Sequence, residues 1–163
     1  MMNNGRESFA DRGAELGIEP PPGGTFLPNT IHNIHCARSS RCAVSADFDG
    51  DGRLDIVTNN FNDAPYYFHN EFPKKNYIAF RLRGVRSNRD AVGAIVRIQQ
   101  GDEIMLRQAQ AAGGYLSHSS KTLHFGLGDQ ASVDRVEIVW PSGLRQVLDN
   151  PAVNRLNDVT EPE

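Results

Sequence analysis

The sequence predicts an all-β protein built from short strands joined by turns. From about residue 53 onward, apolar residues alternate with polar ones at a period of two, as expected of strands that bury one face. Turn formers are plentiful, since the 163 residues include 15 glycines and 9 prolines. Six or so strands at this spacing favour an antiparallel β-sandwich or barrel-like domain between about residues 75 and 160.

The individual strands can be placed in chain order from their alternation. Residues 77–83 are the clearest case, because Ile78, Phe80 and Leu82 fall on one face and small or basic residues on the other. By the same rule we expect strands at residues 54–58, 66–69, 92–99, 104–109, 123–127, 136–140 and 144–148. Residues 140–143 are expected to form a type I turn, since proline is second and glycine fourth.

Composition and charge argue against several classes of protein. Lys and Arg total 17 against 20 for Asp and Glu, a net charge of −3, whereas nucleic-acid binders carry a basic excess. The longest apolar run, residues 91–96, is far shorter than the roughly 18 residues of a membrane span. The first residues contain no apolar stretch of the kind found in a signal peptide. We therefore expect no nucleic-acid partner and no membrane span.

The charge is unevenly distributed along the chain. Residues 43–72 carry six acidic side chains and one basic, whereas residues 74–107 carry eight basic and three acidic. A switch of this kind near Pro73 suggests two modules with different surfaces. Two solvated faces of one module would give the same pattern.

The strongest chemical signal is a cluster of carboxylates in residues 47–55, Asp-Phe-Asp-Gly-Asp-Gly-Arg-Leu-Asp. Acidic residues occupy positions 1, 3, 5 and 9 of this segment, and glycines occupy positions 4 and 6. Carboxylates so close together repel one another unless a cation lies between them. A flexible ring of hard oxygen ligands suits calcium better than magnesium.

This segment predicts a calcium loop that leads into a strand. The expected ligands are the side chains of Asp47, Asp49, Asp51 and Asp55 and the backbone carbonyl of Arg53. The loop begins like an EF-hand, but its position 12 is Thr58 in place of glutamate, and the residues before it are β-branched. The alternative is an acidic, solvated turn that holds no metal.

The loop and two flanking segments resemble a repeat of the FG-GAP/VCBS type. Residues 9–18 (Phe-Ala-Asp-Arg-Gly-Ala-Glu-Leu-Gly-Ile) resemble the opening of such a repeat in the cartilage acidic protein family, and residues 66–70 (Tyr-Tyr-Phe-His-Asn) resemble its closing strand. The resemblance implies one partial β-propeller-type repeat over residues 8–72, after a disordered N-terminus of residues 1–7. Because a single blade cannot bury both faces, it also implies further propeller repeats of a longer parent chain as partners.

Four segments of the second module resemble the signature segments of the ASPIC/UnbV domain. They are residues 87–94 (Ser-Asn-Arg-Asp-Ala-Val-Gly-Ala), 113–117 (Gly-Gly-Tyr-Leu-Ser), 123–128 (Leu-His-Phe-Gly-Leu-Gly) and 136–143 (Val-Glu-Ile-Val-Trp-Pro-Ser-Gly). The resemblance implies an ASPIC/UnbV-like β domain over residues 75–161. It also implies an extracellular, calcium-binding interaction protein, and it implies no particular reaction.

Two further groups of residues are candidate sites. Arg86, Asn88 and Arg89 lie in a polar loop, where a guanidinium could grip a carboxylate or a sulfate of a ligand. A solvated loop, or a salt bridge within it, is the alternative. Cys36 and Cys42 enclose a short loop and would form a disulfide in an oxidising compartment, or stay thiols in the cytosol.

Together these features predict a non-catalytic, calcium-binding recognition or adhesion module that is secreted, periplasmic or held at the cell surface. Its expected partner is an extracellular protein or glycan. The alternative is a carbohydrate-binding accessory module of a secreted polysaccharide-processing protein, with stacking faces from Tyr66, Tyr67, Tyr115 and Trp140. No enzyme is expected, since the chain lacks a G-x-S-x-G motif and its densest carboxylates are assigned to the metal loop.

Overall fold

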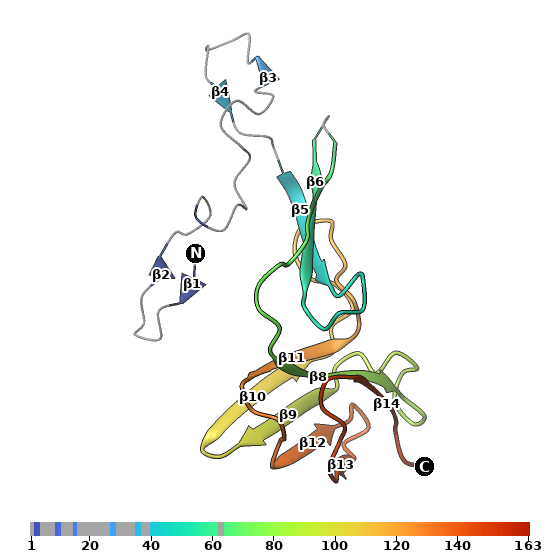
Figure 1. Ribbon diagram of the computed structural model, residues 1–163. Helices are drawn as coiled ribbons and strands as arrows, with labels where there is room; N and C mark the ends of the chain where they lie inside the picture. Colours follow the sequence, from blue (N-terminus) through green and yellow to red (C-terminus); the bar gives the residue numbers. More distant parts are fainter. Residues whose placement is uncertain are drawn as a thin grey trace.

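The computed structural model describes residues 2–3, 9–10, 15, 27–28, 35–36, 40–61 and 64–163. Within these residues every regular element is a strand, which confirms the predicted all-β class (Figure 1). No helix in this part of the chain has the length and apolar character needed to cross a membrane. The strands form five separate sheets.

Two pairs of two-residue strands precede residue 40. β1 (Met2–Asn3) pairs with β2 (Phe9–Ala10), and β3 (Leu27–Pro28) pairs with β4 (His35–Cys36), both antiparallel. The side chains of these strands, and most of the segment that resembles a repeat opening, lie outside the described residues. The domain limits at residues 1–7, 8–72 and 75–161 therefore stay predictions.

A three-stranded antiparallel sheet contains the acidic loop. β5 (Ser40–Ala46), β6 (Asp55–Asn60) and β7 (Tyr66–Phe68) follow one another in space as in sequence. The β5–β6 hairpin extends away from the strands of the C-terminal half, β8–β14 (Figure 1). Tyr67 of β7 and the neighbouring Phe61 and Phe72 stay largely in solvent, exposed by 53%, 52% and 59%. This small sheet therefore buries little apolar surface within the described part of the chain.

The C-terminal half is a sandwich of two sheets. Its strands are β8 (Asn76–Arg83), β9 (Ile95–Gln100), β10 (Glu103–Gln108), β11 (Leu123–Gly128), β12 (Arg135–Val139), β13 (Arg145–Leu148) and β14 (Leu156–Thr160). One sheet has the order β10-β9-β12-β13 and the other the order β11-β8-β14. β9 and β10 form a hairpin, and Gly101 takes a φ of 58° in its turn.

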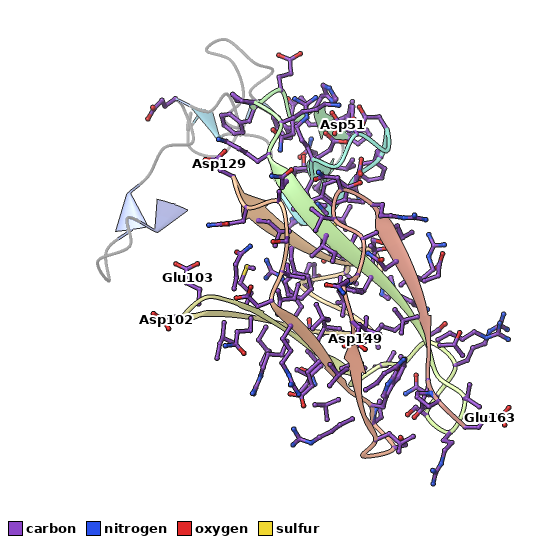
Figure 2. All side chains as sticks on the ribbon, turned by 60° about the horizontal axis from the view of Figure 1, so that its bottom comes forward. Asp51, Asp102, Glu103, Asp129, Asp149 and Glu163 are labelled. Carbon is purple, nitrogen blue, oxygen red and sulfur yellow. The ribbon has the colours of Figure 1, made fainter. Side chains whose placement is uncertain are left out.

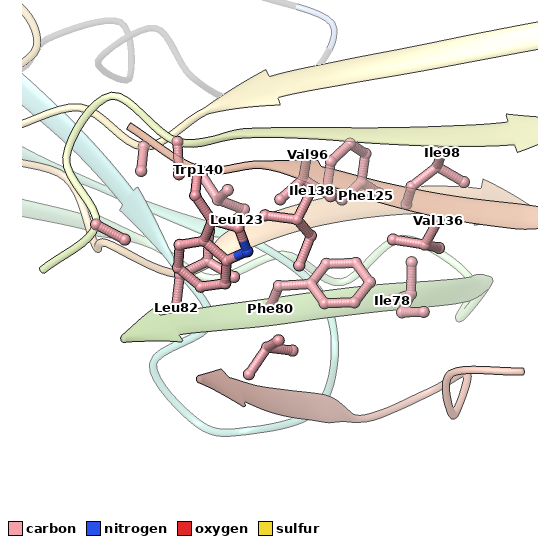
Figure 3. Close-up of a cluster of buried hydrophobic side chains, with 14 of the residues drawn as sticks. Ile78, Phe80, Leu82, Val96, Ile98, Leu123, Phe125, Val136, Ile138 and Trp140 are labelled. Carbon is pink, nitrogen blue, oxygen red and sulfur yellow. The ribbon is translucent and has the colours of Figure 1, made fainter. Parts of the chain in front are cut away.

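The core lies between these two sheets, and it confirms the predicted alternation. Ile78 and Phe80 of β8 and Val96 and Ile98 of β9 are all 0% exposed. Figure 3 shows them packed with side chains of β11 and β12, with Trp140 at one end of the cluster. The predicted turn at residues 140–143 is also present, since the Gly143 amide donates to the Trp140 carbonyl at 2.9 Å.

The structure corrects two details of the predicted strands. β14 pairs with β8 in parallel, so the expectation of a fully antiparallel domain is wrong for this pair. β14 has only Leu156 and Val159 as apolar residues, which is too weak an alternation to reveal a strand. β9 begins later than expected, because Ala91 and Gly93 take φ angles of 51° and 98° and form a turn before it.

Candidate metal centre

The acidic loop joins β5 to β6 in a tight turn that depends on its two glycines. Gly50 and Gly52 have φ angles of 77° and 92°, a region that residues with a side chain rarely adopt. These turns bring three carboxylates together, since one oxygen from each of Asp47, Asp49 and Asp51 lies within 4.8 Å of the others. Three of the five predicted ligands therefore converge, and this group can hold a metal ion.

Asp47 organises the backbone of the loop around this group. Its Oδ1 accepts hydrogen bonds from the amides of Gly50 (2.8 Å) and Asp51 (3.0 Å), and its Oδ2 accepts one from Gly52 (2.9 Å). Carboxylate–amide bonds of this kind fix a turn. They hold the loop in a curved form in which the three carboxylates lie close together.

The negative charge of Asp51 is balanced in part by Arg53. The Asp51 Oδ2 accepts from Nε of Arg53 at 2.7 Å, and the Asp51 Oδ1 accepts from the backbone amide of Arg53 at 2.9 Å. The hydrogen bond from the Arg53 side chain, together with that amide, lowers the pKa of Asp51 to about 2. Lys74 adds a second cation at 3.7 Å from Asp51. Nδ1 of His69 lies 3.9 Å from Asp49, and the charge of Arg53 also acts on Asp49.

Asp55, the fourth predicted carboxylate, lies outside the converging group. It is 1% exposed, and its oxygens accept from the amide of Asn70 (2.8 Å) and the hydroxyl of Tyr67 (2.9 Å). Burial alone would raise the pKa of Asp55, but these bonds, the Phe48 amide and nearby His69 outweigh it and lower the pKa. Asp55 thus ties the loop to the end of β7. Its role as a metal ligand stays a prediction, as does that of the Arg53 carbonyl.

The loop is seated directly on the C-terminal sandwich. The Gly52 carbonyl lies 2.9 Å from Nε2 of His124 on β11, and the His124 ring stacks on Tyr77 of β8 with centroids 5.0 Å apart and planes 7° apart. A Cβ on Gly52 would come within 2.2 Å of Cε1 of Tyr77. Glycine is therefore required at this position by close packing as well as by its φ angle. Figure 2 shows Asp51 at the end of the molecule where the hairpin meets β8.

The second predicted site, Arg86, Asn88 and Arg89, lies in the loop after β8. The Asn88 side chain is engaged within the loop, since its Nδ2 donates to the Val92 carbonyl (2.9 Å) and its Oδ1 accepts from the Val92 amide (2.8 Å). Arg86 and Arg89 are exposed. Their contact with a ligand stays a prediction.

Glu161, which the sequence analysis did not single out, holds this loop in place. It is 2% exposed, and its Oε2 accepts from three successive amides, those of Val85 (2.7 Å), Arg86 (2.8 Å) and Ser87 (2.7 Å). Its Oε1 accepts from the hydroxyls of Ser87 (2.8 Å) and Ser142 (2.5 Å). Burial opposes ionisation, but these hydrogen bonds outweigh it and lower the pKa of Glu161 to about 2. Successive amides that converge on one anion form a nest.

Two other predictions concern the disulfide between Cys36 and Cys42 and the stacking face of Trp140. Cys42 is half-buried in β5, but the side chain of its predicted partner, Cys36, lies outside the described residues, so the disulfide stays a prediction. Trp140 is 1% exposed, with Nε1 donating to Oε1 of Gln146 at 3.0 Å. It is a core residue and cannot supply a stacking face for a sugar, which weakens the carbohydrate-stacking alternative.

A protein-family model described as ASPIC and UnbV matches residues 84–163. This part of the chain is an ASPIC/UnbV domain. The resemblance carried by the four signature segments is thereby confirmed. Within the matched residues, β14 ends directly before the buried Glu161, and β11 provides the histidine that contacts the acidic loop. The FG-GAP/VCBS repeat stays a prediction.

The chain is also homologous to cartilage acidic protein 1. It is 33% identical to the Homo sapiens protein over 124 residues, which cover 72% of this chain and 18% of the relative. It is 29% identical to the Xenopus tropicalis protein over 182 aligned positions, which cover 99% of this chain and 24% of the relative. The chain thus spans about a fifth of the length of these relatives.

The contact between loop and sandwich could not be seen in the sequence. Gly52 is already accounted for by the loop motif, and His124 and Tyr77 occupy solvent-facing positions of alternating strands, where any polar residue would fit. A weak signal exists for Glu161, because a glutamate directly after an edge strand faces the polar loop only if that strand pairs with β8. That pairing is itself not visible without the structure.

Proposed function

We propose that the chain is a non-catalytic recognition module that works outside the cytoplasm and binds calcium through its acidic loop. The observation that carries this proposal is the convergence of Asp47, Asp49 and Asp51 in a loop that contacts the ASPIC/UnbV domain. The family domain and the homology to cartilage acidic protein 1 support a recognition role. No group in the proposal acts on a substrate.

The donor set favours calcium over other metals. The converging groups are carboxylates, and hard oxygen donors suit calcium and magnesium rather than zinc or copper. Asp47 is half-buried and Asp49 is exposed, so water can complete the six to eight oxygens that calcium accepts. Magnesium requires a stricter octahedron. A loop with carboxylates of unequal exposure fits calcium better.

The charge around the loop leaves room for a divalent cation. The four carboxylates of the segment are accompanied by Arg53 and Lys74 and by His69, which is charged only when protonated. Two negative charges are therefore unbalanced when His69 is neutral. One calcium ion would neutralise them, and it would compete with Arg53 for Asp51.

The bound ion would act through the contact between loop and sandwich. Calcium would fix the curvature of the loop, and the loop presents the Gly52 carbonyl to His124 and packs against Tyr77. Ion binding would then hold the β5–β7 sheet in one orientation on the ASPIC/UnbV domain. The surfaces of the two modules would form a single recognition surface.

The proposed location and architecture rest on the relatives and on the exposed sheet. The relatives are named for cartilage, and millimolar calcium outside cells suits a loop with an affinity of about 10⁻⁴–10⁻³ M. We propose that the β5–β7 sheet belongs to one FG-GAP/VCBS-type repeat over residues 8–72. Its half-exposed aromatic residues, such as Phe61 and Phe72, would pack on further repeats of a longer chain.

Thermal unfolding in calcium, magnesium and EDTA tests this function. With calcium at one hundred times its dissociation constant, mass action adds about 2.7 kcal/mol of stability. For a chain of this size that raises the melting temperature by roughly 5–10 °C. Magnesium should give a smaller rise. The substitution Asp49→Asn should abolish the calcium effect, because it removes one of the converging carboxylates.

Asp102→Asn is the matched control. Asp102 is an exposed aspartate in the β9–β10 turn, away from the loop, as Figure 2 shows. This variant should keep the full calcium effect. A single melting temperature in all three conditions, for the parent and for both variants, would rule out the calcium site.

A further inference from the structure

The outer face of the β11-β8-β14 sheet carries a long groove made of two joined hollows. The first has a volume of about 730 Å³ and lies along β8 and β14 beside the loop segments that contain Arg89 and Lys121. The second has a volume of about 710 Å³ and continues towards the acidic loop. The two hollows share Arg81, Ser119, Ser120 and Thr122, so they are continuous.

The lining of this groove is strongly basic, although the chain as a whole has a net charge of −3. Six basic side chains line it: Arg81, Arg83, Arg89, Arg107, Lys121 and Arg155. The carboxylates in the same lining are those of Asp47, Asp90 and Asp158. The groove therefore has an excess of three positive charges over the acidic groups that line it.

Several of these cations lack an acidic partner. Lys121 pairs with Asp90 at 2.5 Å, and Arg81 approaches Asp158 at 3.5 Å. Among the described residues no carboxylate pairs with Arg83 or Arg155, whereas Arg89 shares the charge of Asp90 with Lys121; all three arginines are exposed. Like charges gathered on one concave surface repel one another, so nothing in the fold itself accounts for them.

The positions of these arginines are fixed by ordered structure. Arg83 is the last residue of β8, and its backbone carbonyl accepts from the amide of Glu161 at 2.8 Å. Arg89 lies in the loop that Glu161 holds through three amides, and its carbonyl accepts from the Gly84 amide at 3.1 Å. The backbone therefore presents both guanidinium groups to the first hollow from defined positions.

The chemistry of the lining selects the class of ligand. Guanidinium groups form forked hydrogen bonds with sulfate and carboxylate, and the hydroxyls of Ser119 and Ser120 add neutral donors. The apolar residues of the first hollow, Leu82 and Val159, are each only 8% exposed, because they belong to the core. Protein partners are anchored mainly by buried aromatic or aliphatic side chains, and this hollow offers no pocket for them. A long, polar, hydroxyl-bearing anion fits better.

We infer that this groove binds a linear sulfated glycan. The sulfates lie on Arg83 and Arg89 in the first hollow and on Arg155 and Arg107 in the second, and the sugar hydroxyls lie on the serines between them. The acidic loop closes the second hollow at Asp47, so the chain of sugars ends short of it. This inference names the ligand of the proposed recognition module and in that respect rests on it.

Binding of a heparin-derived octasaccharide to the whole chain, measured by fluorescence anisotropy, tests the inference. We expect saturable binding that weakens as sodium chloride is added, because salt screens exposed charges. The same octasaccharide without sulfates should not bind. The double substitution Arg83→Ala/Arg89→Ala should weaken binding by at least about tenfold, since it removes two charge-assisted contacts.

The matched control is Arg97→Ala/Arg145→Ala. It removes two exposed arginines of β9 and β13, outside the groove, and changes the net charge by the same amount. It should leave binding within about twofold of the parent, because the non-specific attraction of net charge is weak at physiological salt. Melting temperatures close to that of the parent would show that both variants are folded.

Three results would overturn the inference. They are no binding of the sulfated octasaccharide, equal losses in the two double variants, and equally tight binding of a polyglutamate peptide of the same charge. In each case the calcium-dependent rise in melting temperature would be unaffected. If instead that rise were absent while the octasaccharide still bound through Arg83 and Arg89, the calcium site would fail and the groove would stand.

Discussion

Strand β8 begins beside one charged loop and ends beside another. At its start, Tyr77 packs against the acidic loop of residues 47–53, in which carboxylates gather without enough cations. At its end, three backbone amides of the loop of residues 84–92 donate hydrogen bonds to the carboxylate of Glu161. One loop has surplus negative charge, and the other has a nest of donors with its anion already in place.

The difference shows which part of the molecule depends on its surroundings. The loop of residues 84–92 is complete, because its anion is part of the chain. The loop of residues 47–53 has Arg53 and Lys74 as partial substitutes for a cation. We therefore expect the stability of the first to be independent of added ions, and that of the second to follow the calcium concentration.

The largest loss of stability is expected for Gly52→Ala. Gly52 has a positive φ and no room for a Cβ beside Tyr77, whereas Gly50 has a positive φ and no atom within 4 Å of such a Cβ. Gly50→Ala should cost about 1–2 kcal/mol for the left-handed backbone alone. Gly52→Ala should cost about 1–3 kcal/mol more, because Tyr77 must move from its stack with His124. Urea unfolding measures both, and equal losses would mean that the contact with the sandwich contributes nothing.

A smaller but clear loss is expected for Glu161→Gln. The amide keeps the shape of the side chain but brings two N–H donors towards the hydroxyls of Ser87 and Ser142 and loses the negative charge that three amides face. The melting temperature should fall by several degrees, with or without calcium. Asp158→Asn, an exposed position on β14, is the control and should change little. A calcium-dependent loss would show that the two loops are not independent.

Glu161 should also make the stability of the fold depend on pH. Its pKa in the folded protein, about 2, lies below the ordinary value of 4.5. The stability that it provides is therefore fully present above pH 4.5 and is lost as the pH falls through 4.5 towards 2. The difference in melting temperature between the parent and Glu161→Gln should be constant near neutrality and should shrink in that acid range. A difference that grows on acidification would contradict the assignment.

The smallest effect, a change in calcium affinity, is expected for Arg53→Ala. The substitution removes the guanidinium that competes for Asp51 and leaves the backbone carbonyl, the predicted ligand, in place. Calcium affinity should rise by about threefold, because partly exposed charges interact weakly. Arg41→Ala, on β5 away from the carboxylates, should leave the affinity unchanged. A fall in affinity would mean that Arg53 supports the loop more than it competes with the ion.

Much of the fold could be predicted because alternation reports burial directly. Ile78, Phe80 and Leu82 were assigned to one face from sequence alone, and all three are in the core. β14 could not be predicted in this way, because it is an edge strand with two apolar residues, and its pairing with β8 depends on a crossover between distant segments. Local patterns carry no information on such pairings.

The residues of the candidate site also differ in whether local sequence could predict their positions. The convergence of Asp47, Asp49 and Asp51 follows from a nine-residue motif and its glycines, which are local features. The position of Asp55 does not follow from local features. It depends on hydrogen bonds from Tyr67 in β7 and from Asn70 just after β7. The basic groove was foreseen only at Arg89, because its other members come from strands and loops far apart in the chain.

A calcium titration followed by two-dimensional NMR tests the central claim most directly. The amides of Gly50 and Gly52 donate to Asp47, so their resonances should shift and saturate with a dissociation constant of about 10⁻⁴–10⁻³ M. The amides of Gly101 and Gly143, on turns of the sandwich, should not move, and Asp49→Asn should abolish the response. If Gly50 and Gly52 stay unmoved in the parent at millimolar calcium, the loop does not bind this ion and the account is wrong.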